Sequence, residues 1–194
     1  AISIAYAKQN VKIIGSDPGI SAEFNGGTHM SMEDIGVLRS IPELVIYEPV
    51  DVAQFKQALP QIVAYEGPVY IRMFRKTIDD VFTDANYKFD LFGADCIQEG
   101  TAVTIFCSGI MVQETMKANE ILKQEGIDAE IINIHTIKPI DRDAVVASAK
   151  KTGAVVVAEN HNVIGGLTSA VCEVLMEEYP VPLRAVGVKD RFGQ

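Results

Sequence analysis

The chain has 194 residues, of which 48% are hydrophobic and 22% are charged, and its formal net charge at pH 7 is −9. This composition describes a globular protein long enough to form one large domain or two modest ones. The acidic balance, with no basic stretch, argues against general nucleic-acid binding, and no apolar run reaches the roughly 18 residues needed to span a bilayer. Three widely separated cysteines favour reduced thiols in a cytoplasmic protein.

The first third of the chain alternates apolar runs with amphipathic stretches. A short helix at residues 1–7 precedes a compact apolar run at 11–15, which predicts a buried strand. Two further strands are predicted at 44–47 and 68–73, separated by an amphipathic helix that Asp51 caps. Strands that alternate with helices imply a parallel sheet.

A glycine-rich stretch at residues 25–34, NGGTHMSMED, organises this part of the chain. Ser31 and Asp34 have the spacing of a capping box, which predicts a helix over residues 32–39. His29 then lies on a loop just before a helix N-terminus, where unpaired N–H groups favour anions and oxygen-rich ligands. A loop histidine beside glycines can equally be structural or solvated.

Residues 77–99 are polar, acidic and aromatic without a clear period, and predict a connection with a short strand at most. From residue 100 the alternation returns, and Asp141 is expected to cap the second helix of this part. The expected strands are 101–107, 129–134, 154–158 and 183–188, and the expected helices are 111–124, 144–151 and 166–178. The chain therefore predicts an α/β protein of two parallel or mostly parallel three-layer domains. Because it starts within a predicted helix, we expect a fragment of a longer protein.

Ligands of open parallel sheets bind outside the carboxyl ends of the strands, which points to four loops: residues 16–29, 74–76, 108–109 and 160–166. Arg75 follows a strand and could clamp a phosphate or carboxylate, or could be a solvated strand end. Glu159-Asn160-His161 lies at a strand-to-helix turn, where packing or an interface is favoured over ligand binding. His135 is most simply a strand-end histidine with a satisfied hydrogen bond. No two histidines have metal-ligand spacing, so we expect no metal site made by protein ligands alone.

Residues 26–42, GGTHMSMEDIGVLRSIP, resemble the G-P/A-T-H…E-D-I…R-x-I/L-P signature of the thiamine-diphosphate-dependent transketolase family. The similarity runs nearly end to end and in order, and it includes residues 48–51, 67–72, 136–141, 159–161 and 187–193. It implies the C-terminal part of a pyrimidine-binding domain at 1–76, a linker at 77–99, and a transketolase C-terminal domain at 100–194.

The resemblance implies an enzyme of the pentose phosphate pathway type, which transfers a two-carbon ketol unit from a ketose phosphate to an aldose. Thiamine diphosphate would be the electron sink, and the protein would orient it and move protons. His29 matches a catalytic histidine near the cofactor, and Arg75 matches the arginine that holds the substrate phosphate.

Two substrate-binding positions depart from the family pattern. Asn25 stands where an aspartate usually contacts the acceptor hydroxyl, and Asp17 stands where a histidine usually contacts the phosphate, which a carboxylate would repel. The glutamate that protonates the aminopyrimidine, and the G-D-G…N motif for the diphosphate and Mg²⁺, fall outside this chain. The resemblance therefore implies an N-terminal partner subunit or domain, in a dimer, another homo-oligomer or a heterotetramer.

Three alternatives stay open. Two are related enzymes: a 1-deoxyxylulose-5-phosphate synthase, and the β subunit of a 2-oxoacid dehydrogenase. The third is a regulatory or scaffold protein that has retained the fold without catalysis. The Thr-His-x-x-x-Glu-Asp spacing favours transketolase over the dehydrogenase.

Overall fold

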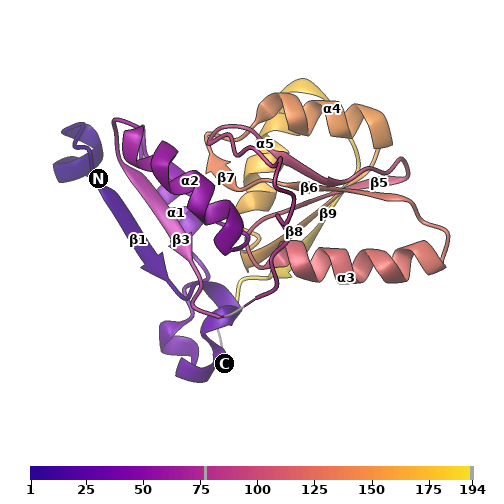
Figure 1. The fold of residues 1–194 in the computed structure, drawn as a ribbon, viewed down its shortest axis with the longest axis horizontal. Coiled ribbons are helices and arrows are strands. Elements are labelled where there is room, and N and C mark those ends of the chain that lie inside the picture. The colour runs from indigo at the N-terminus through magenta and orange to yellow at the C-terminus, as the bar shows by residue number, and fades with distance from the viewer. Residues whose placement is uncertain (77, 193–194) are drawn as a thin grey trace.

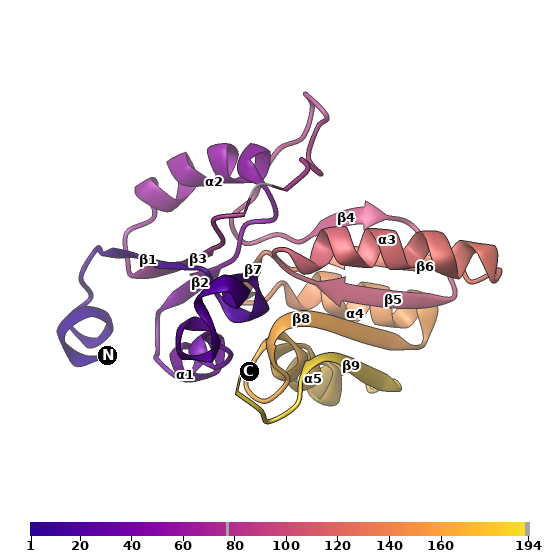
Figure 2. The same cartoon turned by 90° about the horizontal axis from the view of Figure 1, so that it is seen from below.

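The computed structural model describes residues 1–76 and 78–192. Its first sheet has the strand order β1-β3-β2-β7. β1 (Lys12–Ser16), β2 (Val45–Tyr47) and β3 (Val69–Met73) are parallel, whereas β7 (Thr136–Lys138) runs antiparallel to β2. Two helices, α1 (Asp34–Arg39) and α2 (Val52–Ala64), cover opposite faces of this sheet, as Figure 2 shows.

The side chains of β3 explain why helices pack on both faces of the sheet, because successive side chains of a strand point to opposite faces. Ile71 packs in a cluster with Ile62 of α2 on one face. Tyr70 packs in another cluster with Ile35 of α1 on the other face. The predicted N-cap of α2 is confirmed, since the Asp51 carboxylate accepts a hydrogen bond from the backbone N–H of Gln54.

Three details of this region differ from the sequence prediction. The helix predicted at 32–39 begins only at Asp34, and Ser31 does not cap it, because the Ser31 backbone pairs with Pro18 in an isolated bridge. The strand predicted as buried is half exposed, with Ile14 61% exposed, because β1 lies at the edge of its sheet. The predicted N-terminal helix is a π-helical turn, Ile2–Tyr6.

The second sheet has the order β4-β6-β5-β8-β9. Its strands are β4 (Asp95–Gln98), β5 (Val103–Cys107), β6 (Ala129–Asn133), β8 (Val155–Asn162) and β9 (Leu183–Val188). All neighbours pair in parallel except β4, which is antiparallel to β6. In Figure 2, α3 (Met111–Gln124) lies on one face of this sheet, with α4 (Arg142–Thr152) and α5 (Leu167–Glu178) on the other. The predicted α/β, three-layer, mostly parallel fold is confirmed.

The two sheets are interlocked. After β6 the chain leaves the second sheet and adds β7 to the first, where the backbone N–H of Glu48 donates to the carbonyl of His135 at 2.8 Å. One apolar cluster joins Ile35 and Tyr70 of the first domain to Phe106 and Leu167 of the second. Figure 1 shows the two halves side by side. Among the described residues, no helix is long and apolar enough to cross a bilayer.

Candidate functional site

The loop that follows β1 carries the first predicted site residue, Asp17. Its backbone adopts φ 56°, and its N–H donates to the carbonyl of Met73 at 2.8 Å. Ser16 at the end of β1 is paired with Met73 at the end of β3. Because these parallel strands are neighbours, their carboxyl ends bring Asp17 beside Arg75. The Asp17 carboxylate forms an ion pair with the Arg75 guanidinium and accepts the Arg75 backbone N–H at 3.1 Å.

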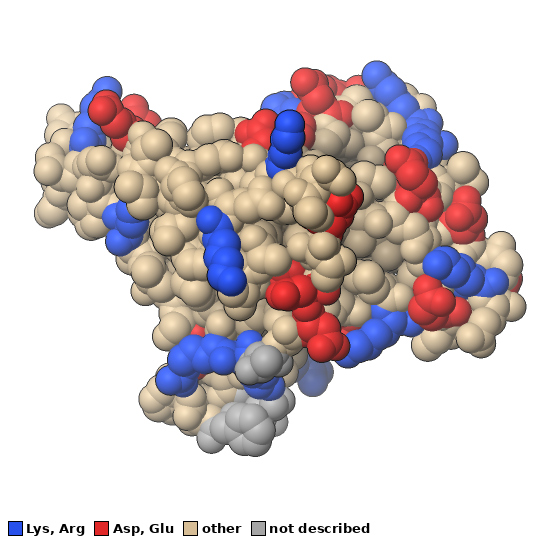
Figure 3. All heavy atoms as spheres, in the orientation of Figure 1, with Lys and Arg blue, Asp and Glu red and all other residues tan. Residues whose placement is uncertain are grey.

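Three predicted substrate-binding residues line one hollow of about 230 Å³: Asp17, Asn25 and Arg75. The hydrogen bond from Arg75 lowers the pKa of Asp17, and the same contact raises the pKa of Arg75, so both groups are charged at neutral pH. The Arg75 side chain is still 69% exposed, which leaves it accessible to a ligand. Lys76 lines the same hollow, and Figure 3 shows basic side chains gathered beside the turns below β1.

His29 lies on the turns that continue this loop, η2 (Gly19–Asn25) and η3 (Gly27–His29). Its side chain is exposed, and its Nδ1 shares a 2.9 Å hydrogen bond with the Thr28 hydroxyl. It lines a separate open hollow of about 680 Å³ with other residues of 27–33 and with Phe192. Gly26 has φ 78°, a conformation that favours glycine. The structure therefore places His29 beside, but not within, the hollow of Arg75.

A buried charged network that the sequence did not reveal lies beneath these loops. Arg72, three positions before Arg75 in the sequence, is 0% exposed. Its guanidinium donates to Asp34 at 2.8 Å, to Glu48 at 2.6 Å and to the Asn160 carbonyl at 3.0 Å. Burial acts to lower the pKa of Arg72, but the two carboxylates outweigh it and raise that pKa. The network joins α1, β3 and β8, so it links the two domains.

The segment Glu159-Asn160-His161 proves to be buried. Glu159 caps α5, because its carboxylate accepts the N–H of Leu167 at 2.7 Å and that of Thr168 at 3.0 Å. Burial lowers the pKa of His161, whose Nε2 lies 3.7 Å from Asp34. These contacts fit the prediction that residues 159–161 serve packing or an interface and do not form an open ligand-binding loop.

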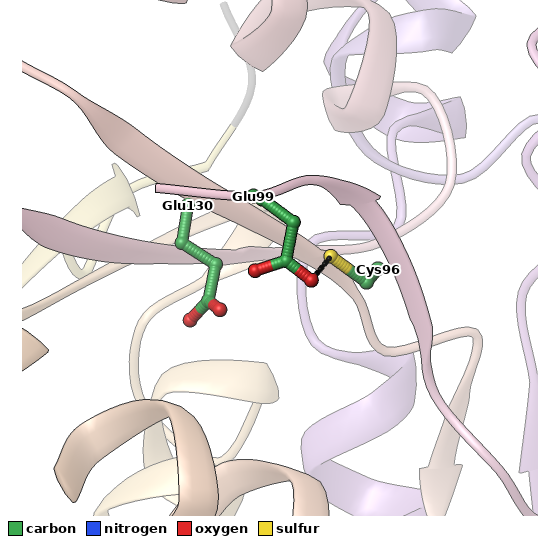
Figure 4. A group of neighbouring side chains, drawn as sticks. All are labelled: Cys96, Glu99 and Glu130. Carbon is green, nitrogen blue, oxygen red and sulfur yellow. Dashed lines mark hydrogen bonds between the residues drawn. The ribbon is translucent and has the colours of Figure 1, made fainter. Parts of the chain in front are cut away.

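The described residues contain one group of three side chains within reach of a shared metal ion: Cys96, Glu99 and Glu130 (Figure 4). The group is poorly suited to a cation. Lys151 pairs with both carboxylates, and burial raises the pKa of the Cys96 thiol to about 11. Mg²⁺ takes oxygen ligands in octahedral geometry, so a protonated thiol and two carboxylates already paired with a lysine do not suit it. The Cys96–Glu99–Glu130 group therefore does not fit the Mg²⁺ half of a thiamine diphosphate site.

Two interlocked α/β domains with polar loops at the carboxyl ends of their strands define a candidate enzyme module. Its family follows from two matches: the transketolase pyrimidine binding domain covers residues 1–79, and the transketolase C-terminal domain covers residues 93–194. The chain belongs to the transketolase family, which confirms the resemblance found in the sequence.

Individual relatives are transketolase subunits. The 6-deoxy-6-sulfo-D-fructose transketolase subunit SqwH of Clostridium sp. (strain MSTE9) is 56% identical over 100% of this chain and 60% of its own length. An apulose-4-phosphate transketolase subunit of Phocaeicola vulgatus is 36% identical over 97% of this chain and 60% of its own. A solved split gene transketolase, an inactive beta4 tetramer, has a TM-score of 0.91 and 43% identity over 99% of this chain and 61% of its own. The chain thus spans about 60% of the length of these relatives.

Proposed function

We propose that this chain is the C-terminal section of a split transketolase, which transfers a two-carbon ketol unit from a ketose to an aldose. The observation that carries the proposal is the convergence of Asp17, Asn25 and Arg75 on one hollow, with His29 on the adjoining turn. The names of the relatives support the same reaction class.

Each of these side chains has a role that its chemistry allows. His29 hydrogen-bonds to the hydroxyls of the ketose donor, for which an imidazole can donate or accept. Arg75 binds the charged end of the sugar, and Asn25 contacts the acceptor hydroxyl. Thiamine diphosphate, when bound, supplies the electron sink for cleavage beside the carbonyl. An N-terminal partner section holds its diphosphate and Mg²⁺, in a dimer or heterotetramer.

The pairing of Asp17 with Arg75 favours a particular charged group on the substrate. The pair has a net charge near zero, so the Asp17 carboxylate offsets much of the attraction of Arg75 for an anion. A phosphate monoester carries about −1.5 to −2 charges at pH 7, whereas a sulfonate carries a single one. We therefore propose a ketose with a terminal sulfonate as the donor, in agreement with the name of the 56% identical relative.

The test combines the full-length subunit with its N-terminal partner and thiamine diphosphate. Ketol transfer to an aldose is measured with 6-deoxy-6-sulfofructose and with fructose 6-phosphate as donors. We expect cofactor-dependent transfer, with kcat/KM about tenfold higher for the sulfonate, which corresponds to about 1.4 kcal/mol. No transfer from either donor would overturn the reaction class, and turnover of pyruvate instead would favour the synthase alternative. A preference for the phosphate would overturn the sulfonate assignment alone.

A further inference from the structure

The side chain of Asn160, on β8 of the second domain, reaches the candidate substrate loop of the first domain. Its Nδ2 donates to the carbonyl of Pro18 at 3.0 Å, and its Oδ1 accepts the backbone N–H of Ile20 at 2.8 Å. One amide therefore bonds to the loop on both sides of Gly19. A Cβ at Gly19 would lie 2.3 Å from Oδ1, so the loop packs directly on the amide, and the φ of +61° favours glycine at this point.

Asn160 is itself fixed in place. It is 6% exposed, and its carbonyl accepts the guanidinium of Arg72 at 3.0 Å. Arg72 is held in turn by the carboxylates of Asp34 and Glu48. Because this charged network is buried, the position of the Asn160 backbone is set by strong, weakly screened interactions.

The clamped loop determines where the candidate substrate groups lie. Asp17 directly precedes Pro18, and its carboxylate forms the ion pair with Arg75. On the far side, the loop continues from Ile20 through η2 to Asn25, which lines the same hollow as Arg75. A shift of the 18–20 backbone would therefore displace groups at both ends of the hollow.

We propose that Asn160 is a positioning residue by which the C-terminal domain holds the loop at 17–20, and through Asp17 orients Arg75 toward the charged end of the substrate. Asn160 need not touch the substrate. The amide is suited to this role because it offers a donor and an acceptor together, which neither aspartate nor leucine can do. The kinetic part of this inference rests on the proposed function, whereas the structural part does not.

The structural test is hydrogen–deuterium exchange on the full-length subunit with Asn160→Ala and Asn160→Asp. We expect backbone exchange in the peptide containing Ile20 to rise about tenfold or more in Asn160→Ala, because the clamp is lost and local opening becomes easier. Asn160→Asp keeps the acceptor for Ile20 but not the donor to Pro18, so its increase is smaller. The control is Asn133→Ala: Asn133 is a 0% exposed asparagine on β6 of the same sheet, and it donates to Asp95 instead. It should leave exchange of the loop unchanged.

The kinetic test uses the complex with the N-terminal partner. In the two Asn160 variants we expect KM for the charged ketose to rise about tenfold while kcat changes less than about threefold, with KM for unsubstituted fructose unaffected. Unchanged loop exchange in both Asn160 variants would overturn the clamp, and so would an equal increase in Asn133→Ala. Faster exchange with an unchanged KM would overturn the link to the substrate. If the wild-type complex transfers no ketol unit, the proposed function fails, and the exchange data still decide the clamp.

Discussion

Asp17 and Arg75 form an ion pair because the strands that precede them, β1 and β3, are parallel neighbours. Asp17 directly follows β1 and Arg75 lies just beyond the end of β3, so both side chains emerge at the same edge of the sheet. The carboxylate that departs from the family pattern is therefore the direct partner of the candidate anion-binding arginine. Its effect on substrate charge can be tested by substitution.

The first prediction concerns the charge at position 17. In the complex with the N-terminal partner, Asp17→His should lower KM for a phosphorylated ketose by about five- to tenfold, since removing a nearby carboxylate favours a dianionic ligand. KM for an unsubstituted ketose should stay nearly constant. Asp17→Asn keeps the size of the side chain and an oxygen that can accept the Arg75 backbone N–H, so it removes the charge and retains the contact that positions Arg75. It should change KM in the same direction. Equal effects on both substrates would show that Asp17 does not face the charged end of the sugar.

The second prediction concerns His29. His29→Ala should lower kcat/KM of the complex by about 10²-fold or more, which corresponds to roughly 2.7 kcal/mol of transition-state stabilisation. The exposed position of His29 means that the free energy of unfolding should hardly change. Met30 lines the same hollow, and Met30→Leu serves as the control that preserves apolar bulk there. Near-normal kinetics of His29→Ala would make His29 a structural or solvated loop residue.

The third prediction concerns the buried network. Asp34→Asn should reduce the free energy of unfolding by about 3–5 kcal/mol, because it removes one charged partner of the fully buried Arg72. Urea denaturation of the folded subunit measures the loss. Glu177→Gln provides a comparison, since Glu177 pairs with the exposed Arg142 at 2.7 Å on the surface. Ion pairs on the protein surface contribute little to the free energy of unfolding. Similar urea denaturation midpoints for Asp34→Asn and Glu177→Gln would contradict the importance of the buried network for stability.

The fourth prediction concerns Asp95, which lies 3.7 Å from the buried His135. His135 has the predicted hydrogen bond, through Nδ1 to the Thr136 hydroxyl, whereas its Nε2 has no hydrogen-bond partner among the described residues. Burial raises the pKa of Asp95 to about 6 from 3.8. Between these values the folded protein binds a proton that the unfolded chain releases, so Asp95 costs stability progressively as pH rises through this window.

Asp95→Asn removes this cost. Relative to wild type, the variant should gain up to about 3 kcal/mol of unfolding free energy as pH rises from about 4 to about 6, and the difference should then level off. Burial lowers the pKa of His135 to about 4, so this histidine reduces the free energy of unfolding as the pH falls. The reduction is common to the wild type and the variant. Denaturation curves at several pH values measure the difference. The exposed Asp80→Asn is the control, and a difference that is flat with pH would contradict the prediction.

The fifth prediction concerns the cofactor. This chain alone should bind thiamine diphosphate weakly, because phosphate and Mg²⁺ contribute much of the anchoring charge and the family's motif for them falls outside this chain. Calorimetry should show no micromolar binding to the isolated chain, and tight binding after addition of the N-terminal partner. Micromolar binding to the chain alone would place the diphosphate site within it.

Local patterns in the sequence determined the elements and their order. Apolar runs and amphipathic periods located most strands and most helices, although they did not predict β7. Asp51 and Asp141 identified two N-caps, since each carboxylate accepts the N–H three residues later. Contiguous motifs such as those at residues 26–42 and 67–72 identified the family. These features depend on residues close together in the chain, where spacing translates directly into geometry.

Only the tertiary structure decided which side chains meet across long stretches of sequence. Arg72 and Arg75 differ by three positions, yet one is fully buried among carboxylates and the other is exposed beside Asp17. The hydrogen bonds of Asn160 to the loop span about 140 residues, and the pairing of Ser31 with Pro18 displaced the start of α1. Such contacts depend on the order of the strands and on how the two domains dock, and the local spacing of apolar residues encodes neither. The desolvation and pairing of a charged side chain likewise depend on everything packed around it.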